Sequence, residues 1–163
     1  NVVRQRFETF FDRLGRAVDG REAEELYRRQ LDASAFLIDG ALELCAYLKD
    51  RYDLYVVTNG TSSTPYKRLA ASGLDGFMKD IFVSEDAGSQ KPQKEYFDYC
   101  FSRIPDANPR RMLLIGDSPA SDIKGGMAAG TYTCWYNPGG QTLPEGMRAD
   151  YEVGSLKELM NLL

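Results

Sequence analysis

Two carboxylates follow a short apolar run and could hold a metal ion. The run 112–115 ends at Gly116, directly before Asp117, and Asp122 lies five residues further on. In an open parallel sheet, ligands bind outside the carboxyl ends of the strands, so an acid placed directly after a buried strand can face a ligand. Two carboxylates without a neighbouring Cys or His favour a hard cation such as Mg²⁺ over zinc. This spacing therefore predicts a magnesium site.

Two further segments carry groups that could bind phosphate. Thr58 ends the apolar run 54–58, and Asn59 follows it in an Asn-Gly turn whose backbone amides can face a ligand. Lys91 comes after a loop and directly before Pro92, which holds the lysine backbone extended. Taken singly, an ordinary turn accounts for the first segment and an ordinary loop for the second. The metal-binding pattern is the more specific of the three signals.

Composition excludes several classes of function. The 163 residues include no histidine, so Ser-His-Asp and Cys-His hydrolysis and the commonest zinc sites are excluded. The net charge of −4 argues against nucleic-acid partners and against an anionic membrane surface, because both need clustered Lys and Arg. Three cysteines without a CxxC pair favour reduced thiols in a cytoplasmic protein. No signal peptide or membrane-spanning apolar stretch is visible.

The hydrophobic pattern changes near residue 52 and predicts an α/β fold. Amphipathic helices are expected over 2–14, 21–31 and 41–48, with no strand among them. Short apolar runs then predict strands over 54–58, 81–83, 112–115, 132–136 and 151–153. Helices are expected between or after them, over 62–72, 93–103, 121–129 and 155–163. This alternation predicts a parallel sheet covered on both faces, with residues 1–50 as a helical unit and residues 51–163 as the α/β core.

The order of the polar groups resembles that of a known family. Three of the four motifs of the haloacid dehalogenase-like (HAD-like) hydrolases have counterparts here: Thr58, Lys91 before Pro92, and Asp117 with Asp122. The strings VVTNG, FVSEDAGSQKP, LLIGDSPASDIKGGMAAG and TCWYNP look like the branch that contains cytoplasmic pyrimidine 5′-nucleotidases. The resemblance implies a Rossmann-like three-layer parallel sheet in which residues 1–50 form a partial helical cap.

The resemblance also implies a reaction, which is hydrolysis of a phosphomonoester through an aspartyl-phosphate with Mg²⁺ as cofactor. By this similarity, the Thr58 hydroxyl and the Asn59 amide bind the phosphoryl oxygens, and Lys91 offsets their negative charge. Asp117 coordinates Mg²⁺ directly, and Asp122 supports the metal or its waters. Lys91 and Asp122 are the expected catalytic residues. The implied substrate is a nucleoside 5′-monophosphate, with a small sugar phosphate or another phosphomonoester as the alternative, because the motifs contact phosphate and not the leaving group.

The chain departs from the family at its first motif. The motif DxDxT, which supplies the aspartate nucleophile, is absent, and the chain looks like the carboxy-terminal part of a larger enzyme. In the family the strand that carries this motif lies between the strands expected here at 54–58 and 112–115. We therefore expect that an upstream segment or a partner fills the gap, or that the two strand edges close on each other. A non-catalytic chain that binds phosphate or metal without turnover is the alternative to an enzyme.

Overall fold

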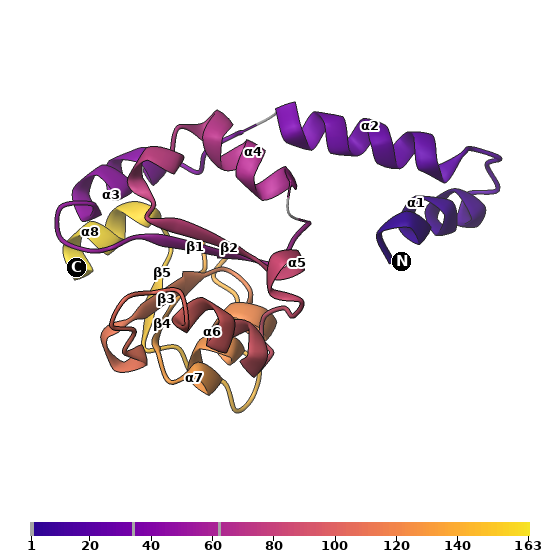
Figure 1. Cartoon of the computed structure of the whole chain (residues 1–163). Helices are drawn as coiled ribbons and strands as arrows, with labels where there is room; N and C mark the ends of the chain where they lie inside the picture. Colours follow the sequence, from indigo (N-terminus) through magenta and orange to yellow (C-terminus); the bar gives the residue numbers. More distant parts are fainter. Residues whose placement is uncertain (1, 34, 62) are drawn as a thin grey trace.

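The computed structural model describes residues 2–33, 35–61 and 63–163, and its elements follow the predicted order (Figure 1). The helices are α1 (Val2–Arg13), α2 (Gly20–Ala33), α3 (Ala41–Leu48), α4 (Ser63–Ser72), α5 (Ser84–Ala87), α6 (Lys94–Phe101), α7 (Lys124–Ala129) and α8 (Leu159–Leu162). The strands are β1 (Tyr55–Thr58), β2 (Asp80–Val83), β3 (Leu113–Gly116), β4 (Tyr132–Tyr136) and β5 (Tyr151–Val153). Among the described helices, none combines the length and the hydrophobicity that a membrane span requires.

The five strands form two parallel sheets. β1 pairs with β2, and β3, β4 and β5 pair in that order. The parallel direction of every pair is confirmed, and the break between β1 and β3 falls where the family resemblance leaves a gap for the strand of the absent first motif. No ladder of hydrogen bonds joins β1 to β3, so direct closure of these two edges, the third possibility raised by the sequence, is wrong.

A cavity of about 880 Å³ lies between β1 and β3. Its walls include Val56 and Val57 from β1, Leu113 and Leu114 from β3, and Cys100 from α6. The edge of each strand that faces this cavity lacks a strand neighbour among the described residues. The cavity is therefore lined by apolar side chains and by backbone groups that a further strand could pair with.

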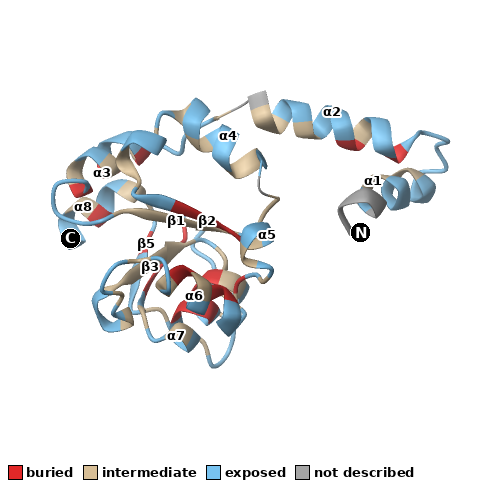
Figure 2. Cartoon of the chain, in the orientation of Figure 1, coloured by how far each residue is buried: buried red, intermediate tan, exposed pale blue. Residues whose placement is uncertain are grey.

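The hydrophobic core is divided in the same way as the sheets. One cluster joins α3 and α8 to the larger sheet through Leu44, Cys134 and Leu159. The other packs α6 against β2, around Phe82 and Tyr96 (Figure 2). The predicted helix 41–48 is confirmed, and its buried face shows why it forms, because apolar residues recur at helical spacing on the side that meets α8.

Helices α1 and α2 form an arm that extends from the α/β body (Figure 1). Within the arm, the Glu24 carboxylate accepts hydrogen bonds from Arg6, at 2.9 and 3.1 Å, and from Arg28, at 3.0 Å. The arm is joined to the body where Asp32 accepts hydrogen bonds from Thr64, at 2.9 Å, and from Lys67, at 2.7 Å. These contacts place α2 beside α4, at the end of the body where β1 finishes.

Candidate phosphate and metal site

A buried ion pair links the two sheets at the carboxyl ends of their strands. The Nζ atom of Lys91 donates to Oδ1 of Asp122 at 2.7 Å and to the carbonyl oxygen of Val57 at 2.8 Å. Both charged residues are buried, with exposed fractions of 9% for Lys91 and 4% for Asp122. A charge pair in such a position interacts more strongly than one in water, because the surrounding dielectric is low. The structure thus brings together two of the residues that the sequence singled out.

Asp122 is fixed by its local backbone as well as by Lys91. It lies in a π-helical turn, Pro119–Ile123, and its Oδ2 accepts a hydrogen bond from the backbone N–H of Ser118 at 3.0 Å. Gly116 leaves the space that this carboxylate needs, since a Cβ atom there would lie 2.5 Å from Cβ of Asp122. Both carboxylate oxygens therefore have a donor before any ligand binds.

The side chain of Asn59 holds the backbone of Lys91. Its Oδ1 accepts from the lysine N–H at 2.9 Å, and its Nδ2 donates to the lysine carbonyl oxygen at 3.0 Å. This reciprocal pair fixes the start of the lysine side chain next to the end of β1. Because the Asn59 side chain is engaged in this way, a contact from Asn59 to a phosphate would come from its backbone N–H.

Tyr96 fixes the backbone at the end of β1. Its hydroxyl accepts a hydrogen bond from the N–H of Thr58 at 2.9 Å and donates to the carbonyl oxygen of Phe82 at 2.6 Å. Burial raises the pKa of Tyr96 far above its ordinary value, so this hydroxyl keeps the proton that it donates. The hydroxyl of Thr58 itself forms no hydrogen bond within the described part of the chain and is available to a ligand.

Asp117 is an exposed carboxylate at the end of β3. Trp135 anchors its backbone, because the indole Nε1–H donates to the Asp117 carbonyl oxygen at 3.0 Å. Within residues 2–33, 35–61 and 63–163 no three acidic, Cys or His residues form a group that could hold a metal ion. Mg²⁺ commonly binds through one or two carboxylates together with waters and substrate oxygens, so Asp117 fits as a partial ligand set.

The sequence did not identify the supporting residues. Asn59 was expected to offer an amide to phosphate, but the reciprocal contact of its side chain with Lys91 was not foreseen. Tyr96 lies within the helix predicted over 93–103, and nothing in the local pattern marks it as a support for β1. The one signal that could have drawn attention to Tyr96 is a hydroxyl on an otherwise apolar helix face, since a buried tyrosine hydroxyl usually has a partner.

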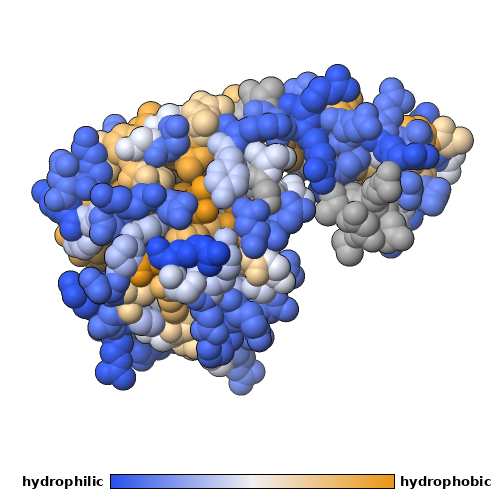
Figure 3. Space-filling view, viewed as in Figure 1, coloured by the Kyte–Doolittle hydropathy of each residue, from blue (hydrophilic) through white to orange (hydrophobic). Residues whose placement is uncertain are grey.

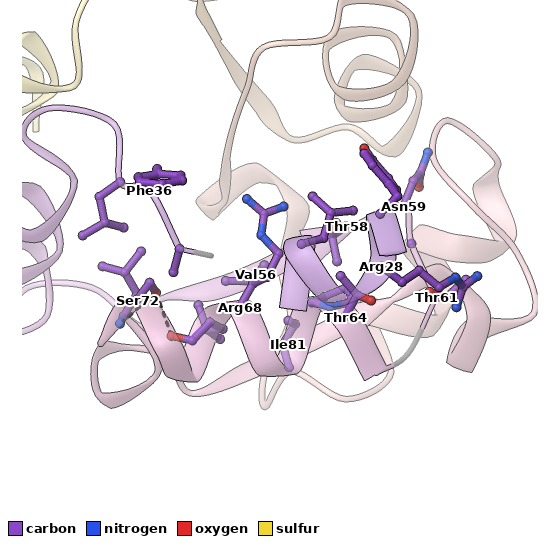
Figure 4. Close-up of a pocket in the computed structure, with 18 of the residues that line it drawn as sticks. Arg28, Phe36, Val56, Thr58, Asn59, Thr61, Thr64, Arg68, Ser72 and Ile81 are labelled. Atoms are coloured by element: carbon purple, nitrogen blue, oxygen red, sulfur yellow. Dashed lines mark hydrogen bonds between the residues drawn. The ribbon is translucent and has the colours of Figure 1, made fainter. Parts of the chain in front are cut away.

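A second cavity, of about 480 Å³, opens beside the strand end that carries Thr58 (Figure 4). Its walls come from α2, the segment after it, the end of β1, and α4. Thr58, Asn59, Gly60 and Thr61 line it on the side of the ion pair. A molecule bound in this cavity could therefore reach the end of β1.

The chain has an α/β fold with polar groups gathered at the carboxyl ends of its strands, and comparison with known proteins assigns it to a family. A family model described as haloacid dehalogenase-like hydrolase matches residues 2–130. The chain belongs to the haloacid dehalogenase-like hydrolases, which confirms the predicted resemblance.

Particular relatives cover almost the whole chain. The HAD-hydrolase YfnB of Bacillus subtilis is 49% identical over 162 residues, which cover 99% of this chain and 69% of YfnB. The pyrimidine 5′-nucleotidase PynA of Streptococcus pneumoniae is 34% identical, with 99% and 69% covered. YjjG of Escherichia coli, also a pyrimidine 5′-nucleotidase, is 33% identical, with 97% and 69% covered. A crystal structure of YfnB bound to magnesium matches with a TM-score of 0.94 at 49% identity, over 99% of this chain and 71% of that one.

Proposed function

We propose that this chain carries the phosphate-binding and magnesium-binding residues of a phosphomonoester hydrolase that acts on nucleoside 5′-monophosphates. The observation that carries the proposal is the buried Lys91–Asp122 pair at the strand ends, beside the hydroxyl of Thr58, which has no hydrogen-bond partner among the described residues. Family membership supports the hydrolase class. The nucleotide substrate is supported by the two pyrimidine 5′-nucleotidases that are 33% and 34% identical.

In this proposal, three groups hold the phosphoryl oxygens. They are the hydroxyl of Thr58, the backbone N–H of Asn59 and the ammonium of Lys91. Lys91 is already oriented by two hydrogen bonds of its own and by the Asn59 side chain, so little reorganisation is needed when charge develops on the phosphate. Asp122 acts on the same step by keeping the ammonium in place.

Asp117 is the residue that we propose as the direct magnesium ligand. It is an exposed oxygen donor at the end of β3, and its backbone is anchored by Trp135. When bound, Mg²⁺ would neutralise charge on the phosphate and supply Lewis-acid polarisation. The magnesium-bound crystal structure of YfnB supports this choice of metal. Asp122 would contribute through a metal-bound water, because both of its oxygens already accept hydrogen bonds.

We further propose that the aspartate nucleophile enters on a strand that fills the cavity between β1 and β3. Neighbouring strands lie about 4.8 Å apart, so a strand that pairs with both edges would join the two sheets into one. The upstream segment or partner that the sequence led us to expect would thus complete both the fold and the reaction. The cavity volume of about 880 Å³ and the two unpaired edges support this position.

The division into a partial cap over residues 1–50 and a core over 51–163 is likewise a proposal. Helices α1 and α2 form the arm next to the phosphate end, as a cap would. Helix α3 packs on α8 in the body, which favours a working boundary between α2 and α3. A small sugar-phosphate phosphatase, or a chain that binds phosphate without turnover, would use the same strand-end groups.

Binding of uridine 5′-monophosphate and inorganic phosphate in Mg²⁺ tests the proposal by calorimetry. We expect Lys91→Met to weaken both ligands about tenfold or more, because it removes the only ammonium in the proposed phosphate subsite. Lys94→Met is the matched control, since Lys94 is exposed and pairs with Asp98 on the same helix.

The second variant is Asp117→Asn, which changes an exposed side chain and removes no core packing. We expect it to remove the effect of Mg²⁺ on phosphate affinity without affecting the Lys91 contacts. Equal affinities of the Lys91 and Lys94 variants, or an unchanged magnesium effect in Asp117→Asn, would contradict the assignment. Circular dichroism of each variant identifies any loss of folding.

A further inference from the structure

The cavity of about 480 Å³ beside Thr58 has a size and a lining suited to a small molecule. Thr58, Asn59 and Thr61 supply polar atoms on the side of the ion pair, and apolar side chains of Val56 and Ile81 form part of the wall. Cavities with this mixture bury the body of a ligand and orient it through a few polar contacts. The groups at the other side of the cavity therefore decide what it can hold.

Phe36 is the most exposed large apolar side chain of the cavity lining. It lies in the segment after α2, with an exposed fraction of 91%. A ligand that covers an exposed aromatic ring gains binding free energy, because apolar surface area is removed from water. Its position on the cavity lining means that a ligand bound beside Thr58 could cover it (Figure 4).

Arg68 supplies a positive charge that the arm does not neutralise. Three arginines line the cavity, and two of them, Arg6 and Arg28, bond to Glu24. Arg68, from α4, forms no ion pair with any residue that the structure describes.

Arg68 lies between Phe36 and Thr58 in Figure 4. The space-filling view shows hydrophobic and hydrophilic side chains side by side around α4 (Figure 3). A guanidinium has five donors and no acceptor, so its partner must present acceptor atoms, and carbonyl oxygens are suitable ones.

We propose that Phe36 and Arg68 form the subsite for the leaving group, in which Phe36 stacks on a planar ring and Arg68 donates hydrogen bonds to ring carbonyl oxygens. This inference rests on the proposed function, because it requires the phosphate of the same molecule to lie at Thr58 and Lys91. The substrates selected are phosphomonoesters that carry a planar, carbonyl-bearing ring. Phosphates of plain sugars, which lack such a ring, bind only through their phosphate end.

Calorimetry with uridine 5′-monophosphate and ribose 5-phosphate, both in Mg²⁺, separates ring recognition from phosphate recognition. We expect the wild-type chain to bind the nucleotide at least about tenfold more tightly than the sugar phosphate. Phe36→Ala and Arg68→Met should each reduce this ratio by roughly a factor of ten and leave the affinity for ribose 5-phosphate unchanged. Both side chains are exposed, so neither change removes core packing.

Matched controls exist outside the cavity. Phe10→Ala removes another exposed phenylalanine, and Arg110→Met removes another exposed arginine. Cytidine 5′-monophosphate isolates a contact of Arg68 with the C4 carbonyl, because cytosine keeps the C2 carbonyl but has an amine donor where uracil has the C4 carbonyl. We expect the wild type to bind the uridine nucleotide more tightly than the cytidine nucleotide, and this preference should disappear in Arg68→Met and persist in Arg110→Met.

The outcomes distinguish this inference from the proposed function. If ribose 5-phosphate binds in a manner that depends on Lys91, but Phe36→Ala and Arg68→Met leave the nucleotide ratio unchanged, the subsite is wrong and the phosphate site stands. If wild-type affinity for the nucleotide equals that for ribose 5-phosphate, ring recognition is overturned as well. If no phosphate ester binds through Lys91, the proposed function itself fails.

Discussion

Asp122 is held from three directions. Lys91 donates to one carboxylate oxygen, the backbone of Ser118 donates to the other, and Gly116 leaves the space that the carboxylate occupies. Removing one partner of a buried ion pair is strongly destabilising, because the other charge stays buried without compensation. A neighbouring substitution that displaces this carboxylate from Lys91 should therefore destabilise the fold even though it changes no charge.

Gly116→Ala tests that sensitivity. The new Cβ would lie 2.5 Å from Cβ of Asp122, so the carboxylate must move and its contacts with Lys91 and Ser118 must weaken. We expect a loss of about 1–3 kcal/mol in the free energy of unfolding, measured in urea. Gly76→Ala serves as the control, because a Cβ there meets no atom within 4 Å. Similar losses in the two variants would show that Asp122 is not constrained by Gly116.

The residue pattern singled out Lys91 and Asp122 but not the residues that hold them. The resemblance placed Lys91 and Asp122 in one site, and the structure joins them at 2.7 Å. The use of the Asn59 side chain to hold the Lys91 backbone could not be predicted, because the two residues are 32 apart in sequence. A local sequence pattern cannot predict this contact, because the contact depends on how the loop after α5 returns to β1.

Glu24 joins the two helices of the arm, because its carboxylate accepts hydrogen bonds from Arg6 in α1 and from Arg28 in α2. Burial alone would raise the pKa of this carboxyl, but hydrogen bonds from Arg28 and Arg6 outweigh it and hold the pKa below its ordinary value of 4.5. The carboxyl is therefore charged in the folded arm over a wider pH range than in the unfolded chain. Its contribution to stability is fully present above about pH 4.5 and is lost as the pH falls through the lower folded pKa.

Glu24→Gln should show this dependence in thermal melts followed by circular dichroism. We expect the melting temperature of the variant to lie below that of the wild type at neutral pH, and the difference to shrink as the pH falls below about 4.5. Glu25→Gln is the matched control on an exposed position of the same helix. A difference that stays constant down to low pH would show that the pairing with Arg6 and Arg28 does not stabilise the arm.

Local patterns predicted most elements but not how the strands assemble. Strands 132–136 and 151–153 appear as predicted, because short apolar runs bounded by loops report strands well. The helix predicted over 121–129 begins later, at Lys124, because a π-helical turn precedes it. Apolar runs carry no record of which strand lies beside which, so the gap between β1 and β3 could be expected only from the family resemblance, in which the strand of the first motif lies there.

The three cysteines lie in different parts of the fold, so their reactivities probe the whole molecule. Cys134 in β4 and Cys100 in α6 are buried, and burial raises the pKa of each thiol to about 11. Cys100 also lines the cavity between the two sheets. Cys45 in α3 is only partly buried, and burial raises the pKa of its thiol as well.

Alkylation at pH 8, followed by mass spectrometry, should modify Cys45 first, then Cys100, and Cys134 last. The order reflects exposure and thiolate fraction, together with the access that the cavity gives to Cys100. A sample in denaturant provides the reference rates. Modification of Cys134 as fast as Cys45 would mean that β4 is not the centre of a stable sheet.

A single ammonium group spans the boundary between the two sheets. Lys91 donates to Val57 in β1 and to Asp122 beside β3, so its geometry depends on how the two halves of the body are docked. A ligand that requires this geometry binds only the docked arrangement and, by mass action, increases its population. Anion affinity and the docking equilibrium are therefore thermodynamically linked, and a phosphate-induced rise in melting temperature would measure the cohesion of the two halves.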